Sequence, residues 1–86
     1  MANANEIAAA IDARVRDTKQ PNYGAWTVGV TEDPARRKTE HGNPPYWMQW
    51  RADSEDHGRA VERHFLDKGM KGGAGGPGAA TYVYIF

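Results

Sequence analysis

Residues 26–41 restrict the fold most, because they predict a strand that leads directly into a helix. Apolar residues alternate with small ones from Trp26 to Val30, which is the period of a strand with one buried face. Asp33 and Pro34 then suit the N-cap and the first position of a helix. The Gly-Asn-Pro-Pro run at residues 42–45 is expected to end that helix.

The corner between this strand and helix carries three residues of chemical interest. Gly29 lies in the strand, and Arg37 and His41 lie four residues apart, so their side chains project from one helix face. A glycine in a strand often permits close approach to the backbone, and a guanidinium one turn from an imidazole suits a bound phosphate. Alternatively, Gly29 only permits close packing, and Arg37 and His41 are ordinary surface residues of a helix.

Length and composition indicate one domain with an aromatic-rich core. A chain of 86 residues is too short for two independent cores, and Leu66 is its only leucine. Three tryptophans and four tyrosines compensate for the shortage of aliphatic residues. We expect the apolar faces of four elements to form the core, namely Ile7, Ile11, Trp26, Val28, Val30, Val61 and Phe65.

Several classes of protein are disfavoured by the composition. The chain has no cysteine, which excludes a disulfide framework and a thiolate metal site. It has no apolar run that would span a bilayer and no secretory signal, so we expect a cytoplasmic location and no membrane partner. The formal net charge is zero, which counts against nucleic-acid binding by strong electrostatic attraction alone.

The remaining segments predict an α+β fold. Asn3 and Glu6 have capping-box spacing at the start of an amphipathic helix that runs to about Lys19. Asp53 or Ser54 caps a third helix. The other predicted elements are a turn at 20–24, a strand at 46–52, a flexible glycine-rich loop at 69–80 and a final strand at 82–86. We therefore predict a small sheet of about three strands, starting at Trp26, Tyr46 and Tyr82, covered by three helices in a single domain, 1–86.

Two of these segments also predict which side chains share a face. In the strand at 46–52, Tyr46, Met48 and Trp50 share one face, and Trp47, Gln49 and Arg51 share the other. Exposed tryptophans beside Arg51 would suit base stacking, but the need for buried area favours them as core and interface residues. In the third helix, the predicted buried face is Ala60, Val61, Phe65 and Leu66.

The corner at Gly29 resembles part of the GIY-YIG nuclease motif. In that motif a strand ending in Tyr-Ile-Gly is followed by a helix with an arginine and a histidine, as Arg37 and His41 follow Gly29 here at eight and twelve residues. Thr27 stands where the motif has its second tyrosine. Val83-Tyr84 resembles the Ile-Tyr of the first motif strand, which makes the resemblance a circular permutation with residues 20–86 as the core and residues 1–19 as an added helix.

The resemblance implies a fold, a reaction and a set of site residues. The Val28 and Tyr84 strands are expected to be antiparallel neighbours, because the family pairs its first two strands as a hairpin. The implied reaction is hydrolysis of a phosphodiester by water, with Mg²⁺ held by Glu62, which lies in an Ala-Val-Glu context on the third helix. Arg37 would offset charge on the phosphate, and His41 and Tyr84 would orient or deprotonate the nucleophile. All four side chains are then expected to converge beside Gly29.

A non-catalytic module that binds nucleic acid or a protein on the same scaffold is the competing interpretation. Thr27 in place of the tyrosine favours it, and so does the single carboxylate, since one unsupported glutamate binds a divalent ion weakly. We take the binding module as the predicted function and the metal-dependent endonuclease as the alternative.

Overall fold

The computed structural model describes residues 2–18, 22–72 and 80–86. Lys19, part of the predicted turn at 20–24 and most of the predicted loop at 69–80 lie outside the described residues. The elements in chain order are α1 (Ala4–Arg16), η1 (Tyr23–Ala25), β1 (Thr27–Thr31), α2 (Pro34–Glu40), β2 (Met48–Arg51), α3 (Glu55–Asp67), β3 (Lys71–Gly72) and β4 (Tyr82–Ile85).

The three α-helices begin where their capping residues predict. Asn3 and Glu6 form the reciprocal capping box at the start of α1. The Asp33 carboxylate accepts from the Arg36 backbone N–H, directly before Pro34 at the start of α2. Ser54 accepts from the first turn of α3. These caps depend on residues three positions apart, so they could be read from the local sequence.

The described strands form one mixed sheet in the order β2-β4-β1-β3. β4 pairs antiparallel with both β1 and β2, and Gly29 lies opposite Tyr84 in the β1–β4 ladder. The predicted antiparallel pairing of the Val28 and Tyr84 strands is therefore confirmed. The sheet has four strands, where about three were predicted, because the two-residue strand β3 pairs in parallel with β1 inside the segment predicted as a loop.

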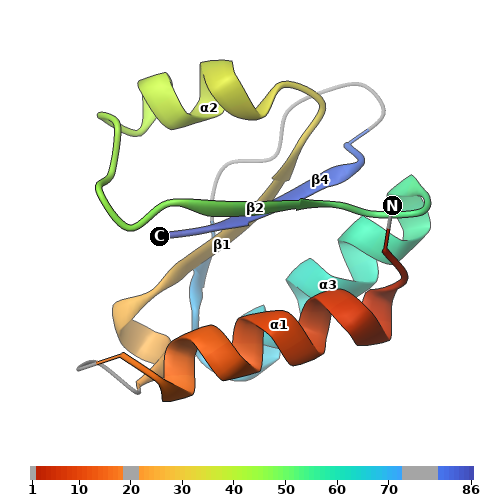
Figure 1. The fold of residues 1–86 in the computed structure, drawn as a ribbon, viewed down its shortest axis with the longest axis horizontal. Coiled ribbons are helices and arrows are strands. Elements are labelled where there is room, and N and C mark those ends of the chain that lie inside the picture. Colours follow the sequence, from red (N-terminus) through yellow and green to blue (C-terminus); the bar gives the residue numbers. More distant parts are fainter. Residues whose placement is uncertain (1, 19–21, 73–79) are drawn as a thin grey trace.

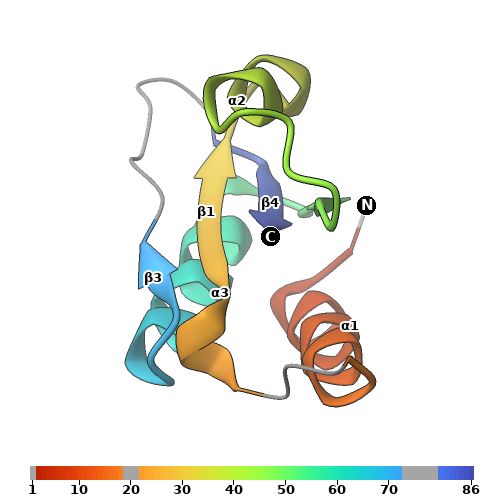
Figure 2. The same ribbon diagram turned by 90° about the vertical axis from the view of Figure 1, so that its left-hand side faces the viewer.

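Helices cover both faces of the sheet, α2 on one and α1 with α3 on the other (Figures 1 and 2). Side chains alternate along a strand, so each face has its own set. Val28 and Val30 of β1 and Val83 and Ile85 of β4 pack with α1 and α3. All seven predicted core residues are at most 5% exposed, which confirms that prediction.

Two predicted details of α3 were wrong. Ala60 is exposed and Leu66 is 39% exposed, so the buried face consists of Gly58, Val61 and Phe65. A Cβ at Gly58 would lie 3.1 Å from the carbonyl oxygen of Ala80, so the glycine lets α3 lie close to the start of the last strand. This contact joins residues far apart in sequence, which helical periodicity does not report.

In the described part of the chain, no helix is both long enough and apolar enough to cross a lipid bilayer.

Candidate functional site

Tyr84 is at the centre of a polar cluster on the α2 face of the sheet. It is 0% exposed but lies outside the main apolar core. Its ring crosses the backbone of Gly29 so closely that a Cβ at that position would overlap the phenol. The small residue in β1 therefore provides the space that the tyrosine ring of β4 occupies.

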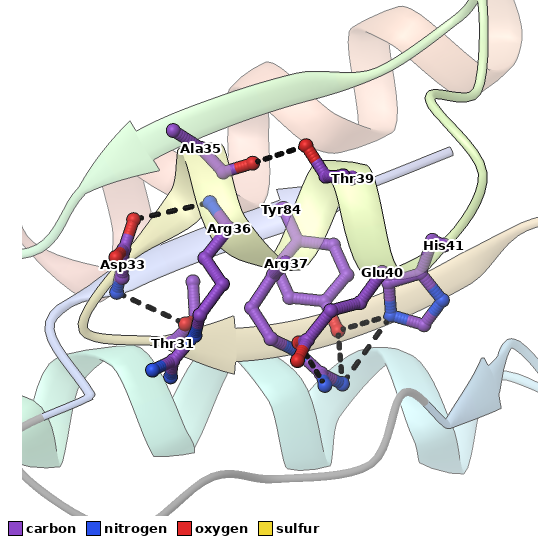
Figure 3. A network of polar contacts seen from close by, with 9 residues as sticks. All are labelled: Thr31, Asp33, Ala35, Arg36, Arg37, Thr39, Glu40, His41 and Tyr84. Carbon is purple, nitrogen blue, oxygen red and sulfur yellow. Dashed lines mark hydrogen bonds and ion pairs between the residues drawn. The ribbon is translucent and has the colours of Figure 1, made fainter.

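Arg37 of α2 and His41, the C-cap residue of the same helix, meet the hydroxyl of Tyr84 (Figure 3). The His41 Nε2 lies 3.1 Å from the Tyr84 oxygen, and the Arg37 Nη2 lies 3.4 Å from the same oxygen. Arg37 and His41 also contact each other at 3.3 Å. Because a guanidinium only donates, the consistent arrangement has Arg37 donating to the phenol oxygen and the phenol O–H donating to a neutral His41.

The electrostatics of the cluster support a neutral imidazole beside a charged guanidinium. Burial, followed by the positive charge of Arg37, lowers the pKa of His41 below its ordinary value of 6.5. The hydrogen bond to Tyr84 is the largest cause that raises the pKa of Arg37. Arg37 also forms an ion pair with Glu40 at 2.9 Å, and its side chain is only 13% exposed. The two terminal nitrogens of the Arg37 guanidinium thus have different partners, Glu40 for Nη1 and Tyr84 for Nη2.

The local backbone explains why both α2 residues reach the sheet. Arg37 and His41 are one turn apart, and His41 is the C-cap residue, where its backbone N–H still bonds to the Arg37 carbonyl. Positive φ values at Gly42 and Asn43 then turn the chain away. The predicted helix end at Gly42 is confirmed, with His41 just beyond the last helical residue.

Aromatic rings close the cluster on its other side. Trp47 stacks on Tyr84 with ring centroids 4.4 Å apart and an interplanar angle of 9°. Phe86 lies 4.8 Å from the ring of His41 and 5.8 Å from that of Trp47. The sequence placed Trp47 on the same strand face as Gln49 and Arg51, but only the pairing of β2 with β4 shows that this face is the one carrying Tyr84.

Trp50 occupies the other face of β2. It is partly buried and packs against the main core, as the preferred interpretation of the tryptophans predicted. Trp47 instead stacks on Tyr84 on the α2 face of the sheet, so the two tryptophans lie on opposite faces although they are only three residues apart in sequence.

Glu62 lies on α3, which packs against the opposite face of the sheet from α2 (Figure 1). It is partly buried, and this burial raises its carboxyl pKa, while the positive charge of Arg59 lowers it. It borders a surface cavity of about 630 Å³ that is lined by Asp56, Arg59, Ala60, Glu62, Arg63, Leu66 and Asp67. The structure therefore brings together Arg37, His41 and Tyr84 beside Gly29. The expected convergence of all four side chains is wrong for Glu62, because α3 packs against the opposite face of the sheet from α2.

The Mg²⁺ ion that the resemblance implies would need several oxygen ligands close together. Within residues 2–18, 22–72 and 80–86, no three His, Asp or Glu side chains are grouped so that they would hold a metal ion together. The Mg²⁺ site at Glu62 would rest on one protein carboxylate and on water or substrate oxygens. It remains a prediction from the resemblance.

Comparisons of this chain with protein-family models, with curated proteins and with solved structures gave no match. The GIY-YIG resemblance therefore rests on the residues quoted in the sequence analysis and stays a prediction.

Proposed function

We propose that this chain is a non-catalytic module that binds nucleic acid on a GIY-YIG-like scaffold. The observation that carries the proposal is the burial of Tyr84 and the engagement of its hydroxyl by neighbouring side chains. Its side chain is fully buried, its hydroxyl contacts His41 and Arg37, and Trp47 stacks on its ring. A group that orients or deprotonates a nucleophile must come within hydrogen-bond reach of it. A phenol enclosed by its own domain is better suited to joining α2 to the sheet.

The alternative is a metal-dependent phosphodiesterase that uses Arg37, His41, Glu62 and Tyr84, with Mg²⁺ as cofactor. It is favoured by the convergence of Arg37, His41 and Tyr84, which come from α2 and β4, more than 40 residues apart in sequence. It requires Glu62 to deliver a metal to the same phosphate from α3. Glu62 lies on α3, which packs against the opposite face of the sheet from α2, so its carboxylate does not stand beside Arg37, His41 and Tyr84.

One set of measurements distinguishes a module that only binds nucleic acid from an enzyme that cleaves it. The purified chain is incubated with single- and double-stranded DNA and RNA, with Mg²⁺, with Mn²⁺ and with EDTA. We expect binding that persists in EDTA and intact nucleic acid under every condition. Cleavage that needs the metal, is lost in Arg37→Ala and Glu62→Gln and remains in Arg63→Gln would contradict the proposal and establish the alternative.

A metal titration followed by amide NMR provides an independent check. A binding module is expected to show no shifts confined to the cluster at millimolar Mg²⁺. Shifts confined to Glu62, Arg37 and Tyr84 would favour the enzyme. If the chain binds none of the nucleic acids, the proposal fails and a protein ligand becomes the partner to test.

A further inference from the structure

The α2 face of the sheet is only partly covered. Over β1, Gly29 and Thr31 are buried, whereas Gln49 and Arg51 of β2 are exposed on the same face. The register puts them there, because Gln49 lies opposite Tyr84 and Arg51 lies opposite Tyr82. Residues directly opposite each other in a ladder share a face. We call Trp47, Gln49, Arg51 and Tyr82 the open face.

Contacts within the molecule already order the side chains of the open face. The Arg51 guanidinium lies over the Tyr82 ring, 5.8 Å from its centroid. The Trp47 indole N–H donates to the Gln49 side-chain oxygen at 2.8 Å, while its ring stacks on Tyr84. A ligand that uses these groups would therefore find them held in place, which lowers the entropic cost of binding.

We infer that the open face binds single-stranded nucleic acid, an inference that rests on the proposed function and assigns its site and ligand class. The face combines aromatic rings with a guanidinium, and bases stack on both kinds of planar group. Its charged member is positive, which complements a phosphate. The face belongs to a sheet, and the bases of a duplex are stacked on one another and so do not present their flat faces to it. A single strand presents them freely.

The small number of cations on the open face predicts how this binding responds to salt. Arg51 is the cation of the open face, so only one or two phosphates are expected to be neutralised. Each neutralised phosphate of a single strand changes the slope of log K against log salt by about −0.7. We therefore expect a slope between about −0.7 and −1.4, with stacking on the rings supplying most of the affinity.

Fluorescence anisotropy with a labelled single strand of about 12 nucleotides tests the inference, since this length covers the usual site size of one small domain. The test variants are Arg51→Gln and Tyr82→Leu, with Tyr82→Phe as the variant that keeps the ring. The matched control is Arg63→Gln, which removes an exposed arginine from α3 on the other layer. Melting temperatures measured for all four variants ensure that each is folded under the conditions used.

Loss of the ring or of the guanidinium is expected to weaken binding about 5- to 100-fold, with Tyr82→Phe and Arg63→Gln within about twofold of the wild type. If Arg51→Gln and Tyr82→Leu bind as tightly as the wild type, the open face is not the site, although the proposed function stands. Preference for a duplex over a single strand also overturns the inference. If the wild-type chain binds no nucleic acid at all, the proposed function fails with it.

Discussion

The cluster around Tyr84 depends on the absence of a side chain at Gly29. A methyl group there would overlap the phenol ring. We predict that Gly29→Ala displaces Tyr84 and lowers the free energy of unfolding by about 1 to 3 kcal/mol, the usual cost of overpacking. Urea unfolding measures the loss, and the ring resonances of Trp47 and Tyr84 report the displacement. Gly42→Ala is a poor control because Gly42 has φ of 81°, so Ala60→Ser on the exposed side of α3 is the better one. If Gly29→Ala has the same free energy of unfolding as the wild type, the Tyr84 ring does not lie across β1.

His41 predicts a pH dependence of stability. Burial and Arg37 lower its pKa in the folded chain below 6.5, so between these two pKa values the unfolded chain binds more protons. The stability that neutral His41 contributes is thus complete above about pH 6.5 and is lost as the pH falls through the folded pKa. We predict that His41→Gln reduces this pH dependence in urea unfolding, whereas Arg36→Gln, a substitution at an exposed position of α2, does not. Equal profiles for wild type and His41→Gln would contradict the environment described for His41.

At the scale of elements, the docking of α3 depends on Phe65. This ring is 0% exposed and packs in the core with Val61 and the α1 residues Ile7 and Ile11. Phe65→Ala is predicted to cost about 3 to 5 kcal/mol, which is close to the whole stability of many small domains. Thermal unfolding followed by circular dichroism measures it. Leu66→Ala is the control, because Leu66 is 39% exposed and its loss is expected to cost much less. Similar melting of Phe65→Ala and wild type would mean that α3 is not docked through this ring.

The sequence predicted those elements whose signals are local. The caps at Asn3, Asp33 and Ser54 located the three helices, and alternation located three strands. β3 was missed because Lys71 and Gly72 have no strand pattern, and only their pairing with distant β1 makes them a strand. Arg37 and His41 could be paired from their spacing. Trp47 and Phe86 could not be assigned to the same cluster, because their positions depend on which strands are neighbours.

For the molecule as a whole, β4 is the strand that joins the sheet together. It lies between β2 and β1, and its Val83 and Ile85 belong to the core. We predict that a fragment ending at residue 79 lacks cooperative unfolding, because β1 and β2 then have no strand between them. A chain lacking residues 1 and 2 loses the bridge from Ala2 to Ala52 and the packing of Ala2 against the core, and it is expected to unfold cooperatively because the β1–β4–β2 pairing is kept. Denaturant unfolding compares the two. A cooperative transition in the shorter fragment would contradict this role of β4.

The position of β4 also has a consequence for synthesis on the ribosome. Val28 pairs with Ile85, so β1 leaves the exit tunnel 57 residues before its partner. During that interval β1 and β2 lack the strand with which both of them pair, so their edges and apolar faces stay uncovered. Until β4 emerges, protection against aggregation is therefore expected to come from the helices, which form from local contacts.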